Sequence, residues 1–162
     1  MRVLPDPVSN PELFDGLLVR RAAAYLIDLL ILGVLAFVVG IVGLVLGLLT
    51  FGLGWLGIPV LIVVATFGYY AMTLGSPARA TVGMQAMDIV LTPARGRPLD
   101  GWAILIHPIV FWVTIWISWP FTILFALFTP RQQLLHDLVT GTLMVRRSPM
   151  EQHWRSARVT PA

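Results

Sequence analysis

Asp28 is the residue of this sequence best placed to do chemistry away from water, because it lies inside a long apolar segment. It follows Arg21 by seven residues, a spacing that puts both side chains on one helix face, two turns apart. A carboxylate at membrane depth costs about 3 kcal/mol and usually faces a cavity or a charged partner. Asp28 is therefore either an ion or proton site or half of a structural ion pair near the membrane interface.

A second group of candidates lies far along the chain. His107 could relay protons, because the ordinary pKa of His is near 6.5, although a hydrogen-bonded or interfacial His is the simpler interpretation. His136 and Asp137 are adjacent, and Asp137 could join Arg21 and Asp28 in a network of charges. His136 is then a second candidate relay. The sequence identifies neither a third ligand nor a nucleophile here, so it predicts no metal, cofactor or catalytic residue.

Apolar helices have to position these residues. The chain has 162 residues, enough for one small domain, and it is 57% hydrophobic but only 12% charged. Ordinary globular chains are roughly 25% charged. No acid, base or His occurs between Leu29 and Ala78. A bilayer tolerates such a stretch, and we predict two transmembrane helices, about residues 21–49 and 56–74.

Three glycines favour close packing of the first predicted span. Gly43 and Gly47 form a GxxxG pattern, and Gly40 lies close to the same face. Small residues at this spacing let transmembrane helices approach each other. The partner helix is either the second span of the same chain or another copy in a homo-oligomer.

The third apolar segment, about residues 102–128, contains Pro108 and Pro120. Blocks rich in Arg precede the first span, follow the second and make up the tail, and the positive-inside rule favours all three in the cytoplasm. We therefore predict a Pro-broken or re-entrant segment with both termini cytoplasmic. The alternative is one straight span that places the tail outside.

The predicted fold is an all-α membrane protein with a small cytoplasmic β pairing of Ile89–Leu91 with Gly141–Val145. Residues 17–147 form the single membrane domain. A flexible lead (1–16) and a flexible tail (148–162) flank it.

The remaining composition narrows the partners. There is no Cys, and the modest net charge of +3 fits the bilayer and its anionic lipid head groups rather than nucleic acid. No nucleophile triad, phosphate loop or metal cluster points to an enzyme.

Three motifs in order resemble the RDD family of small, mostly bacterial membrane proteins, named for one Arg and two Asp. The opening Arg21–Asp28 is similar to the first motif, and Arg131–Thr142 is similar to the closing motif with Asp137 as the second Asp. Thr81-Val82-Gly83 and Ile89-Val90 resemble the central loop. The resemblance covers about residues 17–147. Two positions depart from it, since members often have basic residues where this chain has Met84 and His107.

The resemblance implies a multi-pass protein of the bacterial inner membrane. Transport of unknown ligands has been proposed for the family, and cation/proton exchange for some members. One hypothesis is therefore a transport-related protein, at most cation or proton coupled and working as an oligomer. The other is an accessory or scaffold protein that binds a membrane partner protein or lipid, with Arg21, Asp28 and Asp137 as structural residues.

Overall fold

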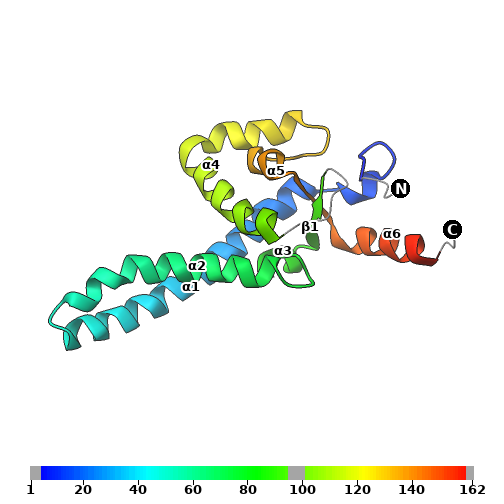
Figure 1. The fold of residues 1–162 in the computed structure, drawn as a ribbon. Coiled ribbons are helices and arrows are strands. Elements are labelled where there is room, and N and C mark those ends of the chain that lie inside the picture. Colours follow the sequence, from blue (N-terminus) through cyan, green and yellow to red (C-terminus); the bar gives the residue numbers. More distant parts are fainter. Residues whose placement is uncertain (1–4, 95–100, 160–162) are drawn as a thin grey trace.

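The computed structural model describes residues 5–94 and 101–159. Two long helices form a hairpin that projects from a compact head built by the rest of the chain (Figure 1). In chain order the elements are η1 Pro11–Leu13, α1 Leu17–Leu49, η2 Leu53–Gly57, α2 Ile58–Leu74, α3 Val82–Ala86, β1 Ile89–Pro93, α4 Gly101–Phe128, α5 Leu135–Thr140, β2 Thr142–Arg146 and α6 Arg147–Val159.

The hairpin of α1 and α2 carries the two predicted membrane helices. Within the described residues, Pro11–Leu49 and Leu53–Leu74 are long and apolar enough to cross a bilayer, judged by length and composition. The 33 residues of α1 rise about 50 Å, more than the ~30 Å of hydrocarbon. One helix can therefore cross the membrane and still reach into the head.

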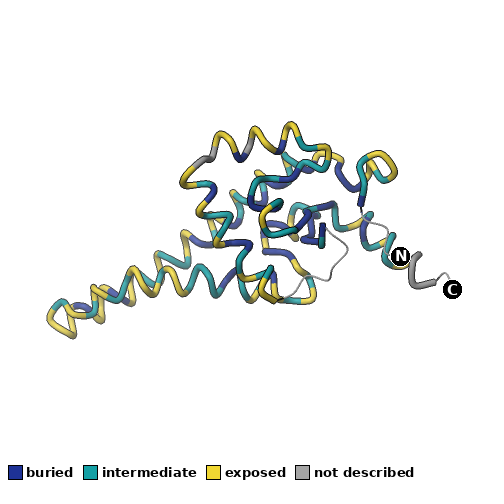
Figure 2. Tube along the Cα trace, turned by 45° about the horizontal axis from the view of Figure 1, so that its top comes forward, coloured by how far each residue is buried: buried dark blue, intermediate teal, exposed yellow. Residues whose placement is uncertain are grey.

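The hairpin and the head also differ in how far their residues are buried. Most residues at the hairpin tip are exposed, whereas buried residues gather in the head (Figure 2). Phe51, at the tip, is fully exposed. Apolar side chains that face outward all round the hairpin are those of a segment solvated by lipid.

Two glycines of α1 line the seam between this helix and the segment formed by η2 and α2. A Cβ atom at Gly43 would lie 2.3 Å from Ile58 Cγ1, and one at Gly47 would lie 1.8 Å from Trp55 Cδ1. Gly40 has nothing within 4 Å of such an atom. The GxxxG pattern thus serves packing within the chain, and Gly40 is not part of that seam.

The predicted β pairing is confirmed, although the first strand, Ile89–Pro93, is longer than predicted and the second, Thr142–Arg146, is shifted by one residue. β1 and β2 form a two-stranded antiparallel sheet in which Val90 pairs with Val145 and Leu91 pairs with Met144. The sheet lies in the core of the head, and Ile89, Leu91, Leu143 and Val145 are fully buried.

The third apolar segment, α4, is bent rather than straight. Its two parts, Gly101–Ile117 and Pro120–Phe128, differ in direction by 117°. Pro120 cannot donate a backbone hydrogen bond, so it favours a kink at this point. If the bent pair counts as one span, the chain has three candidate spans. Its path through the bilayer stays a prediction.

The two segments that flank the predicted membrane domain have more structure, in their described residues, than the sequence predicted. Leu13 and Phe14 of the expected flexible lead are buried in the head. The described part of the expected tail is helical in α6, and it is attached to the head where Asp88 accepts hydrogen bonds from the backbone N–H and hydroxyl of Ser148 and where Met150 packs in the core. Buried apolar residues thus anchor both segments to the head, and the Asp88–Ser148 hydrogen bonds add to the attachment of the second.

Candidate functional site

One face of α1 positions the first two candidate residues. The buried residues of its head-side half are Leu17, Arg21, Ala24, Asp28 and Leu32. They recur every three or four residues, which is the repeat of a single helix face. Arg21 and Asp28 therefore share a face, as their spacing predicted. They do not bind each other, because each finds a different partner in the head.

Asp28 is closed in by three neutral donors, a group we call the Asp28 clamp. Its Oδ1 accepts from the hydroxyl of Tyr69 at 2.6 Å and from the N–H of Gly83 at 2.9 Å, and its Oδ2 accepts from the hydroxyl of Thr81. The clamp thus ties α1 to α2 and to the start of α3. Asp28 is only 6% exposed, so a carboxylate that hydropathy places in lipid is shielded by protein.

Gly83 is required by this close approach. A Cβ atom there would lie 2.2 Å from the carbonyl oxygen of Ala24 and 2.9 Å from Asp28 Cγ. The local fold supports the contact, because Thr81 caps α3 by accepting from the N–H of Met84. Thr81 thereby holds the Gly83 N–H toward the carboxylate.

Asp137, unlike Asp28, forms an ion pair with the guanidinium of Arg21. Its Oδ2 lies 2.6 Å from Arg21 Nη2 and also accepts from the N–H of Leu134 at 3.0 Å. Arg21 Nη1 donates to the carbonyl of Gln132 at 3.2 Å. Both charged side chains are buried. The pair therefore joins α1 to α5, and the Gln132 contact adds the segment just before α5.

The other oxygen of Asp137 faces two histidines. Its Oδ1 lies 3.3 Å from His136 Nε2 and 4.0 Å from His107 Nε2. Among the described residues, neither Oδ1 nor His136 Nδ1 has a hydrogen-bond partner, although both are buried. His107 Nδ1 lies 3.2 Å from the hydroxyl of Thr140 and 3.1 Å from that of Thr142. We call His107, His136 and Asp137 the Asp137 centre.

The protonation states in the Asp137 centre follow from burial and from Arg21. Burial lowers the pKa of His136 to about 3, although the nearby Asp137 acts against this shift. Burial alone would raise the pKa of Asp137, but Arg21 and the two histidines together lower it below its ordinary value. At neutral pH the centre therefore holds an ionised carboxylate beside a neutral imidazole.

The structure thus divides the five predicted site residues into two groups. Arg21, His107, His136 and Asp137 come together, with the rings of the two histidines 5.0 Å apart. Asp28 stands apart in its own clamp. Its structural partners are neutral, whereas the sequence suggested Arg21.

Sequence reasoning missed the partners that complete both groups. The hydroxyl of Tyr69, near the far end of the second predicted span, donates to Asp28. Thr81 and Gly83 were noted only for their resemblance to a motif. The sequence did contain a sign of these donors, because Thr81 stands at a helix start two positions before Gly83. Such a pair can offer a hydroxyl and a closely approaching backbone N–H.

The fold and its buried charges define a small membrane protein with an apolar helical hairpin and a polar-cored head. The sequence model of the RDD family matches residues 16–141, which is most of the chain. The protein therefore belongs to the RDD family. No curated protein and no solved structure matches the chain significantly.

Proposed function

We propose that this protein is an accessory or scaffold protein of the membrane, in which Arg21, Asp28 and Asp137 are structural residues. The observation that carries this proposal is the closure of the Asp28 clamp. Three donors from α2 and from the start of α3 saturate the carboxylate. A transport carboxylate would have to break these bonds in every cycle, at a cost of about 1.5–3 kcal/mol for each bond to a charged group.

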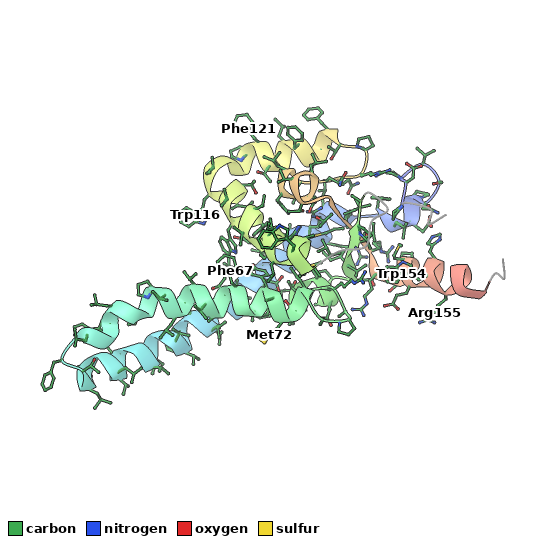
Figure 3. The ribbon with its side chains drawn as sticks, viewed as in Figure 1. Phe67, Met72, Trp116, Phe121, Trp154 and Arg155 are labelled. Carbon is green, nitrogen blue, oxygen red and sulfur yellow. The ribbon has the colours of Figure 1, made fainter. Side chains whose placement is uncertain are left out.

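The partner in this proposal is a membrane protein or lipid that meets the apolar surface of α4. Trp116 and Phe121 flank the bend of α4 and point away from the head (Figure 3). Large exposed aromatic side chains are common where proteins meet membrane partners or the lipid interface. The arginines of the head then lie on the cytoplasmic side by the positive-inside rule.

The test is the variant Asp28→Asn, which keeps the shape of the side chain but brings an N–H₂ group toward three donors. We expect a loss of monodisperse protein in detergent and a lower melting temperature. Asp15→Asn is the matched control, since the Asp15 side chain is exposed and its Oδ2 lies 3.7 Å from Arg146 Nη1 at the surface. A well-folded Asp28→Asn protein that loses pH-driven cation flux in proteoliposomes would contradict the scaffold proposal.

A second candidate function, cation- or proton-coupled transport, is favoured by a different observation. Asp137 keeps one buried oxygen without a hydrogen-bond partner among the described residues. Such an oxygen can accept a proton or a cation, and α4 and α5 would have to move to exchange it with water. An oligomer would supply the remaining walls of a pathway. The measurement is pH-dependent cation flux by the purified protein, which should fall in His136→Gln if this candidate is correct.

A further inference from the structure

We propose that His107, His136 and Asp137 bind one divalent ion of the first transition row, with Zn²⁺ as the reference ion. The inference does not depend on either function proposed above. It rests on the distances, burial and hydrogen bonding of three side chains from α4 and α5.

The three residues have the spacing of metal ligands. Each offers one ligand atom, and these atoms all lie within 4.8 Å of one another. Asp137 Oδ1 lies 3.3 Å from His136 Nε2 and 4.0 Å from His107 Nε2. Zinc bonds of 2.0–2.2 Å in a tetrahedral site place ligand atoms about 3.4 Å apart. Side-chain shifts on the order of 1 Å would therefore complete the coordination geometry.

The ligand atoms do not satisfy each other. Asp137 Oδ1 and His136 Nε2 are close, yet Oδ1 has no hydrogen bond among the described residues. Both side chains are at most 1% exposed. A buried acceptor without a partner is costly, and most such atoms in proteins have one. A metal ion between the rings and the carboxylate would supply the missing partner for Oδ1.

The surrounding contacts orient the ligands as an outer shell does. The hydroxyls of Thr140 and Thr142 hold His107 Nδ1, so the opposite ring atom, Nε2, faces Asp137. Arg21 and the N–H of Leu134 both take Oδ2, which leaves Oδ1 for the metal. Metal-binding His and carboxylate groups are usually fixed by such contacts.

The donor set selects the class of ion. Two imidazoles and one carboxylate suit Zn²⁺, Co²⁺, Ni²⁺ or Cu²⁺, whereas Mg²⁺ and Ca²⁺ prefer oxygen ligands alone. Arg21 offsets the charge of Asp137, so this site binds more weakly than the same ligands would without the arginine. Three protein ligands leave a fourth position for water or another small ligand.

The test uses the full chain, purified in detergent with a tag that contains no histidine and stripped with a chelator. We expect about one Zn²⁺ per chain by mass spectrometry of the metal, a melting temperature that rises with Zn²⁺, and no rise with Mg²⁺. His107→Gln and His136→Gln should each weaken Zn²⁺ binding at least about 10-fold. The control His153→Gln changes a half-exposed His on α6 and should leave binding unchanged.

The proposal is overturned if the wild type binds no more Zn²⁺ than the double variant of His107 and His136, or if His153→Gln weakens binding equally. Where the variants do not fold, Cu²⁺ on the wild-type protein decides. An electron paramagnetic resonance spectrum with coupling to two nitrogens supports the site, and coupling to fewer than two overturns it. Failure of the metal site leaves the scaffold proposal standing, because the Asp28 clamp contains none of these ligands.

Discussion

Two buried carboxylates, Asp28 and Asp137, lie in the same head and are treated in opposite ways. Asp28 is bound by neutral donors alone, a phenol, a hydroxyl and a backbone N–H, and both its oxygens are occupied. Asp137 has a guanidinium on one oxygen and no hydrogen bond, among the described residues, on the other. The hydrogen bonds of Asp28 come from uncharged groups on both oxygens. The charge of Asp137 is balanced by Arg21, and its Oδ1 remains a free acceptor among the described residues.

The difference teaches that charge compensation and hydrogen-bond satisfaction are separate requirements. An arginine can neutralise a carboxylate through one oxygen. Filling both oxygens takes donors from several directions, which the Asp28 clamp obtains from two other elements. We therefore expect the Asp28 clamp to carry structure and the Asp137 centre to carry any ligand chemistry.

Breaking the Arg21–Asp137 pair should have the largest effect. Arg21→Met leaves a buried carboxylate without its cation, and such a change typically costs about 3–5 kcal/mol. We expect a large drop in the melting temperature in detergent. The double variant Arg21→Met/Asp137→Leu should recover part of the loss, because an apolar pair replaces the uncompensated charge. Arg155→Met, at an exposed site, is the control.

The close approach at the Asp28 clamp comes next. Gly83→Ala places a methyl group against the Ala24 carbonyl and should cost about 1–3 kcal/mol, because backbone has to move. Gly68→Ala in α2 meets nothing within 4 Å and should be neutral or slightly stabilising. Equal melting temperatures for the two variants would show that the clamp is looser than described.

Removing a single donor should have a smaller effect. Tyr69→Phe takes one hydrogen bond from Asp28 and an acceptor from the N–H of Val82, and should cost about 1.5 kcal/mol. Two donors remain on Asp28, so the protein should stay folded. Thermal unfolding against Tyr25→Phe, which removes a hydroxyl outside the clamp, measures the difference. A cost as large as that of Arg21→Met would mean that neutral donors matter as much as charge.

The smallest effect should come from Asp88, a more exposed carboxylate that serves as a reference for the two buried ones. Slight burial acts to raise the pKa of Asp88, but Ser148 and Arg146 lower it below its ordinary value of 3.8. A carboxylate whose pKa is lowered by folding stabilises the folded state at pH values above its ordinary pKa. This contribution is lost as the pH falls through the lowered pKa. Solvent screening keeps the contribution below about 1 kcal/mol. Asp88→Asn should weaken the dependence of the melting temperature on pH below about pH 4. An unchanged pH dependence would show that the Asp88 carboxylate does not contribute to stability in this way.

The sequence by itself determined the kind of protein, its two long apolar helices and its two short strands. Those features depend on local patterns, since lipid solvation needs only a run of apolar residues and a strand needs only a few β-branched ones. The periodicity of α1 also placed Arg21 and Asp28 on one face. The residues Arg21, Asp28 and Asp137 could likewise be identified from the sequence, because each belongs to a short local motif.

Only the tertiary structure decided which charges meet. Arg21 and Asp137 are separated by 116 positions, and Asp28 and Gly83 by 55, so no local spacing could pair them. The structure also folded the ends of the domain onto the head and assigned the Gly43–Gly47 seam to the chain itself. A buried charge takes whichever partner the packed head brings within about 3 Å, and that choice depends on the positions of elements remote in sequence.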